Sequence, residues 1–477
     1  MNNNISKKQY IISESEKKKL ISLLCILLLF SIMNSTMFMV SVPDIAYYFD
    51  LLPSQVSWVV TGYIILYSIG ALLYGKLGDI FPIKNLLTFG IALFVLGSIF
   101  GFFSPNYLMV VISRMIQACG AAAIIAIVFV IPSRYFPHEK GQMLGVLSSA
   151  MAFGAGLGPV LGGFIAGFLD WHYIFLFSFV VVLTLPFIRV LLPIEEKKSG
   201  KPDVIGAILM AAGVALFILF ITTFNWIYFL LSTLIIGTFF WWIFHYKHPL
   251  ILPEMFKNKV FRLTVLTSFF GTLIMFSNLF ILPLLLREVH SLSTIQIGLV
   301  LFPGAILGAF VGRVAGGFTD RFGSYSVGYF AITLILIGSF LLSSFVGFAP
   351  WIISLIFSIN FIAFPIFQTS MANLISSVLP DDQMGVGMGI YNLGNLLSGA
   401  VGGAIIGRIL DYSFIGISLN PFIESIGVVV VYSNIFVGMA LLTIFIGLYF
   451  YLSNRKHQML LLRDDVQKFE PVSYKNE

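Results

Sequence analysis

The chain has 477 residues, of which 58% are hydrophobic and only 10% charged, and its mean hydropathy is +0.99. Soluble domains carry about 25% charged residues, so this composition excludes an ordinary soluble protein and indicates a chain that crosses a membrane many times. The 27 basic residues exceed the 21 acidic ones, which gives a net charge of +6. Cys25 and Cys119 lie far apart in apolar runs, so we expect no disulfide framework, no metal site and no cofactor.

The N-terminal segment, residues 1–19, is polar and ends in three lysines. A signal peptide also begins with basic residues, but the apolar run that follows here extends to Pro43 and contains no small-residue cleavage site. We therefore expect a cytoplasmic tail followed by a retained first span.

Fourteen apolar runs, each long enough to cross a bilayer at about 20 residues, predict an all-α polytopic membrane protein. They cover residues 20–43, 56–74, 86–103, 107–131, 143–168, 173–192, 204–223, 227–245, 261–286, 296–318, 326–346, 351–375, 385–409 and 429–453.

Lysine and arginine predict the orientation, because they concentrate on the cytoplasmic side. With the N-terminus inside, all but three of the 27 basic residues fall in cytoplasmic segments. The exceptions are Arg287 and Arg408, placed in external loops, and Arg114, placed within the fourth span. We expect both termini in the cytoplasm, a location in the plasma membrane and no nucleic-acid partner, because the positive charge follows the topology.

An internal repeat predicts two equivalent halves. Residues 75–79 (Gly-Lys-Leu-Gly-Asp) follow the second span, and residues 316–320 (Gly-Gly-Phe-Thr-Asp) follow the tenth. We therefore expect a six-helix half at 20–192 and another at 260–453, as in transporters built from parallel repeats. Residues 193–259 then form a cytoplasmic linker with two inserted helices at the periphery, and 454–477 form a cytoplasmic tail.

Small residues recur every three or four positions from Gly154 to Gly163 in the fifth span. They leave one helix face nearly without side chains, and Pro159 favours a kink. By itself the pattern indicates close helix packing of any kind.

These segments resemble the Major Facilitator Superfamily. Gly75, Leu77, Asp79 and Lys84 match its loop signature, although Pro82 replaces a glycine, and residues 112–122 around Arg114 resemble its fourth-span motif. The chain is similar to the 14-span drug:proton antiporter-2 branch, and especially to Gram-positive tetracycline exporters of the K and L classes, in the runs 42–46, 74–77, 290–294 and 302–304. The resemblance implies the fold of this superfamily and a function in drug efflux. It also implies that Gly154–Gly163 is an antiporter motif at the interface between the halves.

Asp79 and Asp320 stand at cytoplasmic helix ends in both halves, so we expect them to form gates that make and break contacts between states. The alternative is that they are solvated loop charges. The predicted gating residues are Gly75, Asp79, Lys84, Asp320, Arg321, Gly154, Gly158, Pro159, Gly162 and Gly163.

Arg114 requires a partner, because a charge within a membrane span is costly. Asp44, at the external end of the first span, is the nearest acidic residue by depth. We predict that the two form a proton-relay pair that opens and closes with the external mouth; the alternative is a structural arginine bonded to backbone carbonyls.

Neutral polar side chains within the spans are candidates for the lining of a substrate cavity, although each of them alone is as typical of contacts between helices. They are Asn34, Ser35, Gln117, Asn278, Gln368, Tyr391, Asn392 and Asn395.

The tetracycline exporters carry membrane glutamates where this chain has Ser35, Ala155 and Gly399. A carboxylate is the usual group that exchanges a proton for a cationic substrate. Three hypotheses follow: a proton-driven exporter of neutral, zwitterionic or anionic amphipaths, a transporter that is uncoupled or differently coupled, and a transport-inactive sensor or scaffold.

We favour proton-coupled efflux of an amphipathic small molecule by alternating access, with tetracycline as the best single substrate by resemblance. The chain has no P-loop and no nucleophile–base arrangement, so we expect a gradient-driven monomer in the lipid bilayer that is not an enzyme.

Overall fold

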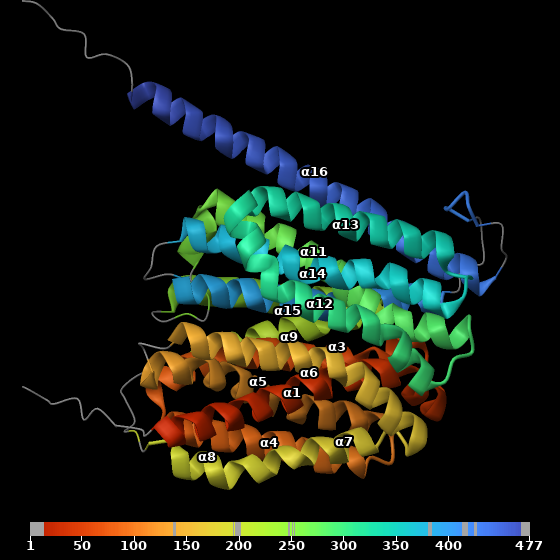
Figure 1. The fold of residues 1–477 in the computed structure, drawn as a ribbon, viewed down its shortest axis with the longest axis horizontal. Helices are drawn as coiled ribbons and strands as arrows, with labels where there is room; N and C mark the ends of the chain where they lie inside the picture. The colour runs from red at the N-terminus through yellow and green to blue at the C-terminus, as the bar shows by residue number, and fades with distance from the viewer. Residues whose placement is uncertain are drawn as a thin grey trace, which may run out of the picture.

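The computed structural model describes residues 14–136, 140–193, 195, 202–246, 249, 251, 253–379, 384–412, 418–423 and 427–468. Across these residues all regular elements are helices and no strand occurs. The long helices run side by side, and α1 begins at the left end of the bundle in Figure 1. We call this end the proximal end and the opposite one the distal end.

The helices group into two bundles, coloured red to yellow and green to blue in Figure 1. The N-terminal bundle contains α1 (Glu14–Phe49), α2 (Pro53–Val56), α3 (Trp58–Ile80), α4 (Ile83–Phe102), α5 (Tyr107–Tyr135), α6 (Lys140–Phe168), α7 (Tyr173–Ser178), the 3-10 helix η2 (Phe179–Thr184) and α8 (Leu185–Leu191). The C-terminal bundle contains α11 (Lys259–Glu288), α12 (Thr294–Phe322), α13 (Ser324–Phe345), α14 (Pro350–Val378), α15 (Met384–Asp411) and α16 (Val428–Lys468).

Between the bundles in sequence lie α9 (Val204–Thr223), α10 (Trp226–His245) and the short η3 (Pro253–Lys257). α10 packs on α9 and is peripheral, as predicted for the insert. α9 contacts α3 of one bundle and α15 of the other. With only 22% of its most apolar window buried, α9 also lies at the periphery, but it follows the seam between the bundles, which the sequence did not predict.

Thirteen helices of the described chain are long and apolar enough to span a membrane, and a shorter apolar helical segment, Phe153–Phe168, lies within α6. Each of the fourteen predicted runs falls on a helix, with 173–192 divided among α7, η2 and α8. The count of fourteen spans stays a prediction.

Polar residues fix where several helices begin. The Asn106 side chain accepts a hydrogen bond from the Met109 amide, and Asn258 does the same for Val260. Ser293 and Gln296 form a capping box at the start of α12. Such caps satisfy amides that the first helical turn leaves unpaired, so these asparagines and serines mark the bundle ends in the sequence.

The two bundles repeat the same packing at the same positions. Gly97 is the fifteenth residue of α4 and lies against the backbone of Gln117, the eleventh residue of α5. Gly338 is the fifteenth residue of α13 and lies against the side chain of Asn360, the eleventh residue of α14. This correspondence extends the repeat that Gly75 and Gly316 indicate in the sequence.

Candidate functional site

Arg114 on α5 is buried, with 1% of its surface exposed. Its Nη1 donates hydrogen bonds to Oδ1 of Asn34 at 2.7 Å and to Oε1 of Gln117 at 2.6 Å, and its Nε donates to the Val59 carbonyl at 3.4 Å. Among the residues that the structure describes, no carboxylate forms an ion pair with it. Neutral groups alone hold this buried guanidinium.

Aromatic rings cover both sides of the same group. The Cζ atom of Arg114 lies 4.0 Å from the ring centre of Phe38 and 4.0 Å from that of Tyr63. A cation over an aromatic face is stabilised most where water is excluded. Further hydrogen bonds join Gln117 to Ser98 and Asn34 to Ser178. The Arg114 cluster, defined by these seven side chains, therefore draws on α1, α3, α4, α5 and α7.

Asp44 does not pair with Arg114, which corrects the predicted pair. Nη2 of Arg287 donates to Oδ1 of Asp44, and the Thr294 hydroxyl donates to Oδ2 at 2.6 Å. Arg287 also donates to the Thr294 hydroxyl at 2.7 Å. Because α1 belongs to one bundle and α11 and α12 to the other, this distal contact joins the two bundles.

The error has a simple physical origin. Depth along a span suggested Arg114 as the partner, but α11 continues through Glu288, so Arg287 lies in its last helical turn and not in a loop. Arg408 likewise lies in the last turn of α15. The sequence did contain an indication of this contact. Basic residues concentrate on the cytoplasmic side, so an external arginine such as Arg287 is an exception that suggests a specific partner.

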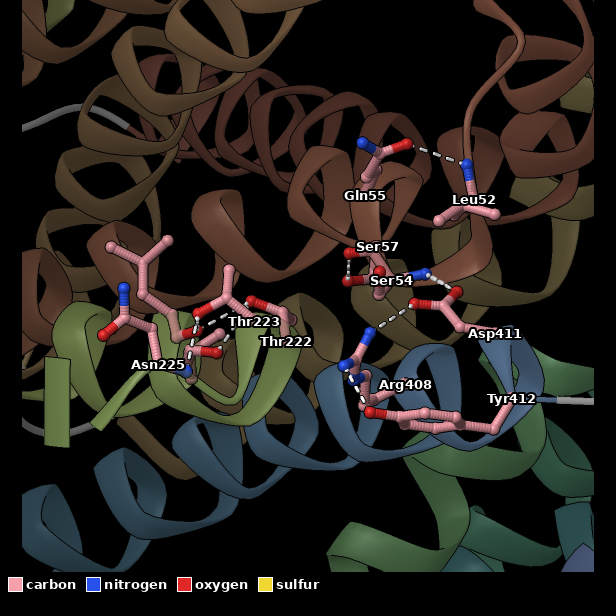
Figure 2. A network of polar contacts seen from close by, with 12 residues as sticks. Leu52, Ser54, Gln55, Ser57, Thr222, Thr223, Asn225, Arg408, Asp411 and Tyr412 are labelled. Atoms are coloured by element: carbon pink, nitrogen blue, oxygen red, sulfur yellow. Dashed lines mark hydrogen bonds and ion pairs between the residues drawn. The ribbon is translucent and has the colours of Figure 1, made fainter. Parts of the chain in front are cut away.

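A second distal contact joins α15 to α2, and Figure 2 shows it. Oδ1 of Asp411 accepts a hydrogen bond from the Ser54 amide at 2.9 Å, and its Oδ2 lies 3.3 Å from Nη1 of Arg408. Arg408 also donates to the Tyr412 hydroxyl at 2.6 Å. Its Cζ lies 5.5 Å from the ring centre of Phe224, at the end of α9, so the insert touches this contact.

The glycines of α6 use two faces. β-carbons at Gly154 and Gly162 would lie 2.8 Å from the backbone of α1, and one at Gly158 would overlap the Thr36 hydroxyl. A β-carbon at Gly163 would lie 2.8 Å from the Thr294 carbonyl on α12, and Gly298 of α12 packs on the Pro159 carbonyl. The stretch thus packs on its own bundle through Gly154, Gly158 and Gly162, and on the other bundle through Gly156, Pro159 and Gly163.

At the proximal end, Glu195 binds three helices of the N-terminal bundle together. Its carboxylate accepts a hydrogen bond from the Ile83 amide at 2.9 Å and pairs with Arg134 at 3.2 Å. Arg134 in turn donates to the Gly78 carbonyl at 2.8 Å, and the Lys84 ammonium donates to the Leu192 carbonyl at 3.4 Å. Glu195 belongs to the predicted linker, and its carboxylate is bound to the N-terminal bundle.

The remaining predicted gate residues lie near the same end. The Asp79 side chain lies outside the described residues, and Asp320 and Arg321 are exposed. A β-carbon at Gly75 would have no neighbour within 4 Å. In the described part of the chain, Asp320 and Arg321 form no ion pair between the bundles, in contrast to the distal Asp44.

The C-terminal bundle holds a neutral polar network on α11, α14 and α15. The Tyr391 hydroxyl donates to the side chain and the carbonyl of Gln368, and Asn395 donates to Gln368 at 3.1 Å. Ser268 donates to Asn395 at 2.7 Å, and Gln368 donates to Thr272 at 3.2 Å. Three predicted cavity residues, Gln368, Tyr391 and Asn395, therefore meet in one network.

The other predicted cavity residues do not join it. Asn392 is exposed and Ser35 half-buried, whereas Asn278 is fully buried and has no hydrogen-bond partner among the described residues. In that same part of the chain no three His, Cys, Asp or Glu side chains gather as metal ligands would.

Two helical bundles joined by a two-helix insert, with buried polar clusters and closely packed glycines, define a multi-span membrane transporter. The chain belongs to the Major Facilitator Superfamily, whose model matches residues 24–403.

Similar proteins include transporters of different compounds. The chain is 24% identical to the lincomycin resistance protein LmrB of Listeria monocytogenes, over 78% of this chain and 82% of that one. It is 27% identical to the riboflavin transporter RibZ of Clostridioides difficile, over 68% and 73% respectively. A bacterial homologue of the human lysosomal transporter Spinster, in an inward-facing and occupied conformation, shares the fold with a TM-score of 0.64 at 13% identity, over 93% of this chain and 98% of that one.

Proposed function

We propose that this protein exports amphipathic small molecules from the cytoplasm by alternating access, in exchange for protons. This proposal rests on the hydrogen bonds that Asp44 accepts from Arg287 and Thr294 across the two bundles. In this proposal the distal end faces outward, both termini are cytoplasmic, and the structure represents the outward-closed state. Drug-resistance relatives such as LmrB support an export role.

Asp44 supplies the proposed link between the gate and the proton. When the bundles part at the distal end, the Asp44 carboxylate loses both partners and can accept a proton. Closure on Arg287 needs the ionised carboxylate, because only the anion forms the ion pair. Closing the distal gate therefore requires Asp44 to lose its proton, and exchange for substrate requires that this proton leaves toward the cavity that then opens to the cytoplasm.

The test is transport by purified protein in liposomes with an imposed pH gradient, with tetracycline as the first substrate to be tried. We expect substrate uptake to dissipate the gradient, and Asp44→Asn to abolish this coupling. Asp50→Asn is the matched control, because Asp50 is an exposed carboxylate six residues further along. Substrate flux with no proton movement in the unmodified protein would contradict antiport.

A second candidate is a transporter that is uncoupled or differently coupled and carries neutral or anionic amphipaths. The observation in its favour comes from the resemblance to tetracycline exporters. At the positions of their membrane glutamates this chain has Ser35, Ala155 and Gly399, which carry no carboxylate. A β-carbon at Gly399 would lie 2.8 Å from the ring of Phe276, so this position has no room for a glutamate without repacking.

A further inference from the structure

The positive charge of Arg114 has no partner of opposite sign in the described part of the chain. Its hydrogen-bond acceptors are two side-chain amides and one carbonyl. Asp44, the acidic partner that the sequence suggests, is bound to Arg287 and Thr294 instead. Asn34 is the twenty-first of the 36 residues of α1, so the guanidinium that it binds lies deep in the bundle. A buried charge without a counter-ion is costly, and a ligand that supplies one relieves the cost.

One edge of the guanidinium has no hydrogen-bond partner in the described part of the chain. Nη1 uses both of its protons and Nε uses its single one, whereas Nη2 makes no hydrogen bond to any other residue that the structure describes. Phe38 and Tyr63 cover the two faces. A group that reaches Arg114 must therefore approach in the plane of the guanidinium, where the two protons of Nη2 are the remaining donors and an oxyanion is the matching acceptor.

From this geometry we infer that the exporter selects amphipaths carrying one negative group, and that Nη2 of Arg114 is the donor that binds this group. The inference rests on the proposed function and specifies its substrate class. A cationic amphipath meets an unpaired like charge at Arg114. Arg114 is the eighth residue of α5, and the eighth residue of the equivalent helix α14 is Phe357. The C-terminal bundle therefore has no arginine at the equivalent position, and the proposed recognition of negative charge belongs to the N-terminal bundle.

Three probes with the same apolar body test the inference: pyrenebutyrate, pyrenebutanol and pyrenebutylamine. Their binding to the purified protein is measured by energy transfer from tryptophan to pyrene. We expect pyrenebutyrate to bind at least tenfold more tightly than pyrenebutylamine, with pyrenebutanol between them. Arg114→Gln should remove this difference, and Arg114→Lys, which keeps the charge but not the planar guanidinium, should retain part of it.

Arg189→Gln is the matched control, because it removes one exposed positive charge from α8 and should leave the anion preference unchanged. Unfolding temperatures of all variants show whether they are folded. If Arg114→Gln does not fold, the anion preference is tested with Arg114→Lys instead. If the unmodified protein binds the cation as tightly as the anion, or if Arg114→Gln keeps the anion preference, the inference is wrong while the proposed function stands. If none of the three probes binds, the proposed function fails as well.

Discussion

Asp411 at the end of α15 accepts a hydrogen bond from the Ser54 amide at the start of α2, at 2.9 Å, and so joins the two bundles on the side opposite to Asp44. Each bundle thus contributes one aspartate to the distal closure. Gly407 lies beside it, and a β-carbon there would lie 2.8 Å from the Pro53 carbonyl. The α3–α15 seam is therefore closed by tight backbone packing as well as by charge.

We predict that Asp411→Ala opens this seam. Hydrogen bonds to charged groups contribute about 1.5–3 kcal/mol, enough to shift an equilibrium between closed and open states tenfold or more. Spin labels at the exposed positions Leu52 and Ile409 should report a longer distance in the Ala variant, in a background without Cys25 and Cys119. Asp411→Asn keeps an oxygen acceptor for Ser54 and should stay near the unmodified distance; an unchanged distance in the Ala variant would refute the role.

We predict that Gly158→Leu abolishes transport. The new side chain would overlap Thr36 of α1, and small-to-large changes in a packed site displace backbone. Gly237→Leu on α10 is the control, since a β-carbon there has no neighbour within 4 Å, and it should transport normally. Uptake is compared at equal amounts of protein in the membrane. Normal transport by Gly158→Leu would show that close packing of α6 on α1 is not required.

A matched pair of substitutions in the two bundles should have opposite effects on stability. Both polar atoms of buried Asn360 lack a partner in the described chain, so Asn360→Leu should raise the unfolding temperature in detergent. Gln117 bonds to Arg114 and Ser98, so Gln117→Leu should lower stability by about 1–3 kcal/mol. A loss of stability in Asn360→Leu would indicate that the Asn360 amide has a structural partner.

We predict that Glu195→Ala loosens the proximal end of the N-terminal bundle. The Ile83 amide and Arg134 both lose their carboxylate partner, and loss of such a charged hydrogen bond typically costs about 1–3 kcal/mol. Hydrogen exchange at the start of α4 should increase, while α11–α16 should be unaffected. Glu254→Ala, which removes an exposed carboxylate, should leave exchange at α4 unchanged. Equal protection in Glu195→Ala would show that this residue does not hold the bundle end.

Much of the architecture follows from hydropathy, because apolar runs of bilayer length leave little choice but helices. The glycine–aspartate repeat also located the corresponding second spans of the two bundles. Sequence could not tell which charges meet, since that depends on the lengths and tilts of helices far apart in the chain. Arg114 was correctly singled out as buried within a helix, but its partners Asn34 and Gln117 had been assigned to a cavity, and Arg287 had been assigned to a loop.

The position of α9 could not be predicted either. Its hydropathy is that of any lipid-facing span, and only 22% of its most apolar window is buried. The polar bonds of α9 are local: Asp203 caps the helix and accepts a hydrogen bond from Trp242 of the neighbouring α10. Such local bonds carry no signal of long-range position in a single sequence.

The place of α9 makes the two seams between the bundles unequal. The α3–α15 seam carries an extra helix along its length, and the chain that leads to this helix is fixed to the N-terminal bundle at Glu195. Relative motion is thus restrained on one side of the molecule, and the bundles should separate farther along α6 and α12. We expect substrates to enter sideways from the membrane on that less restrained side.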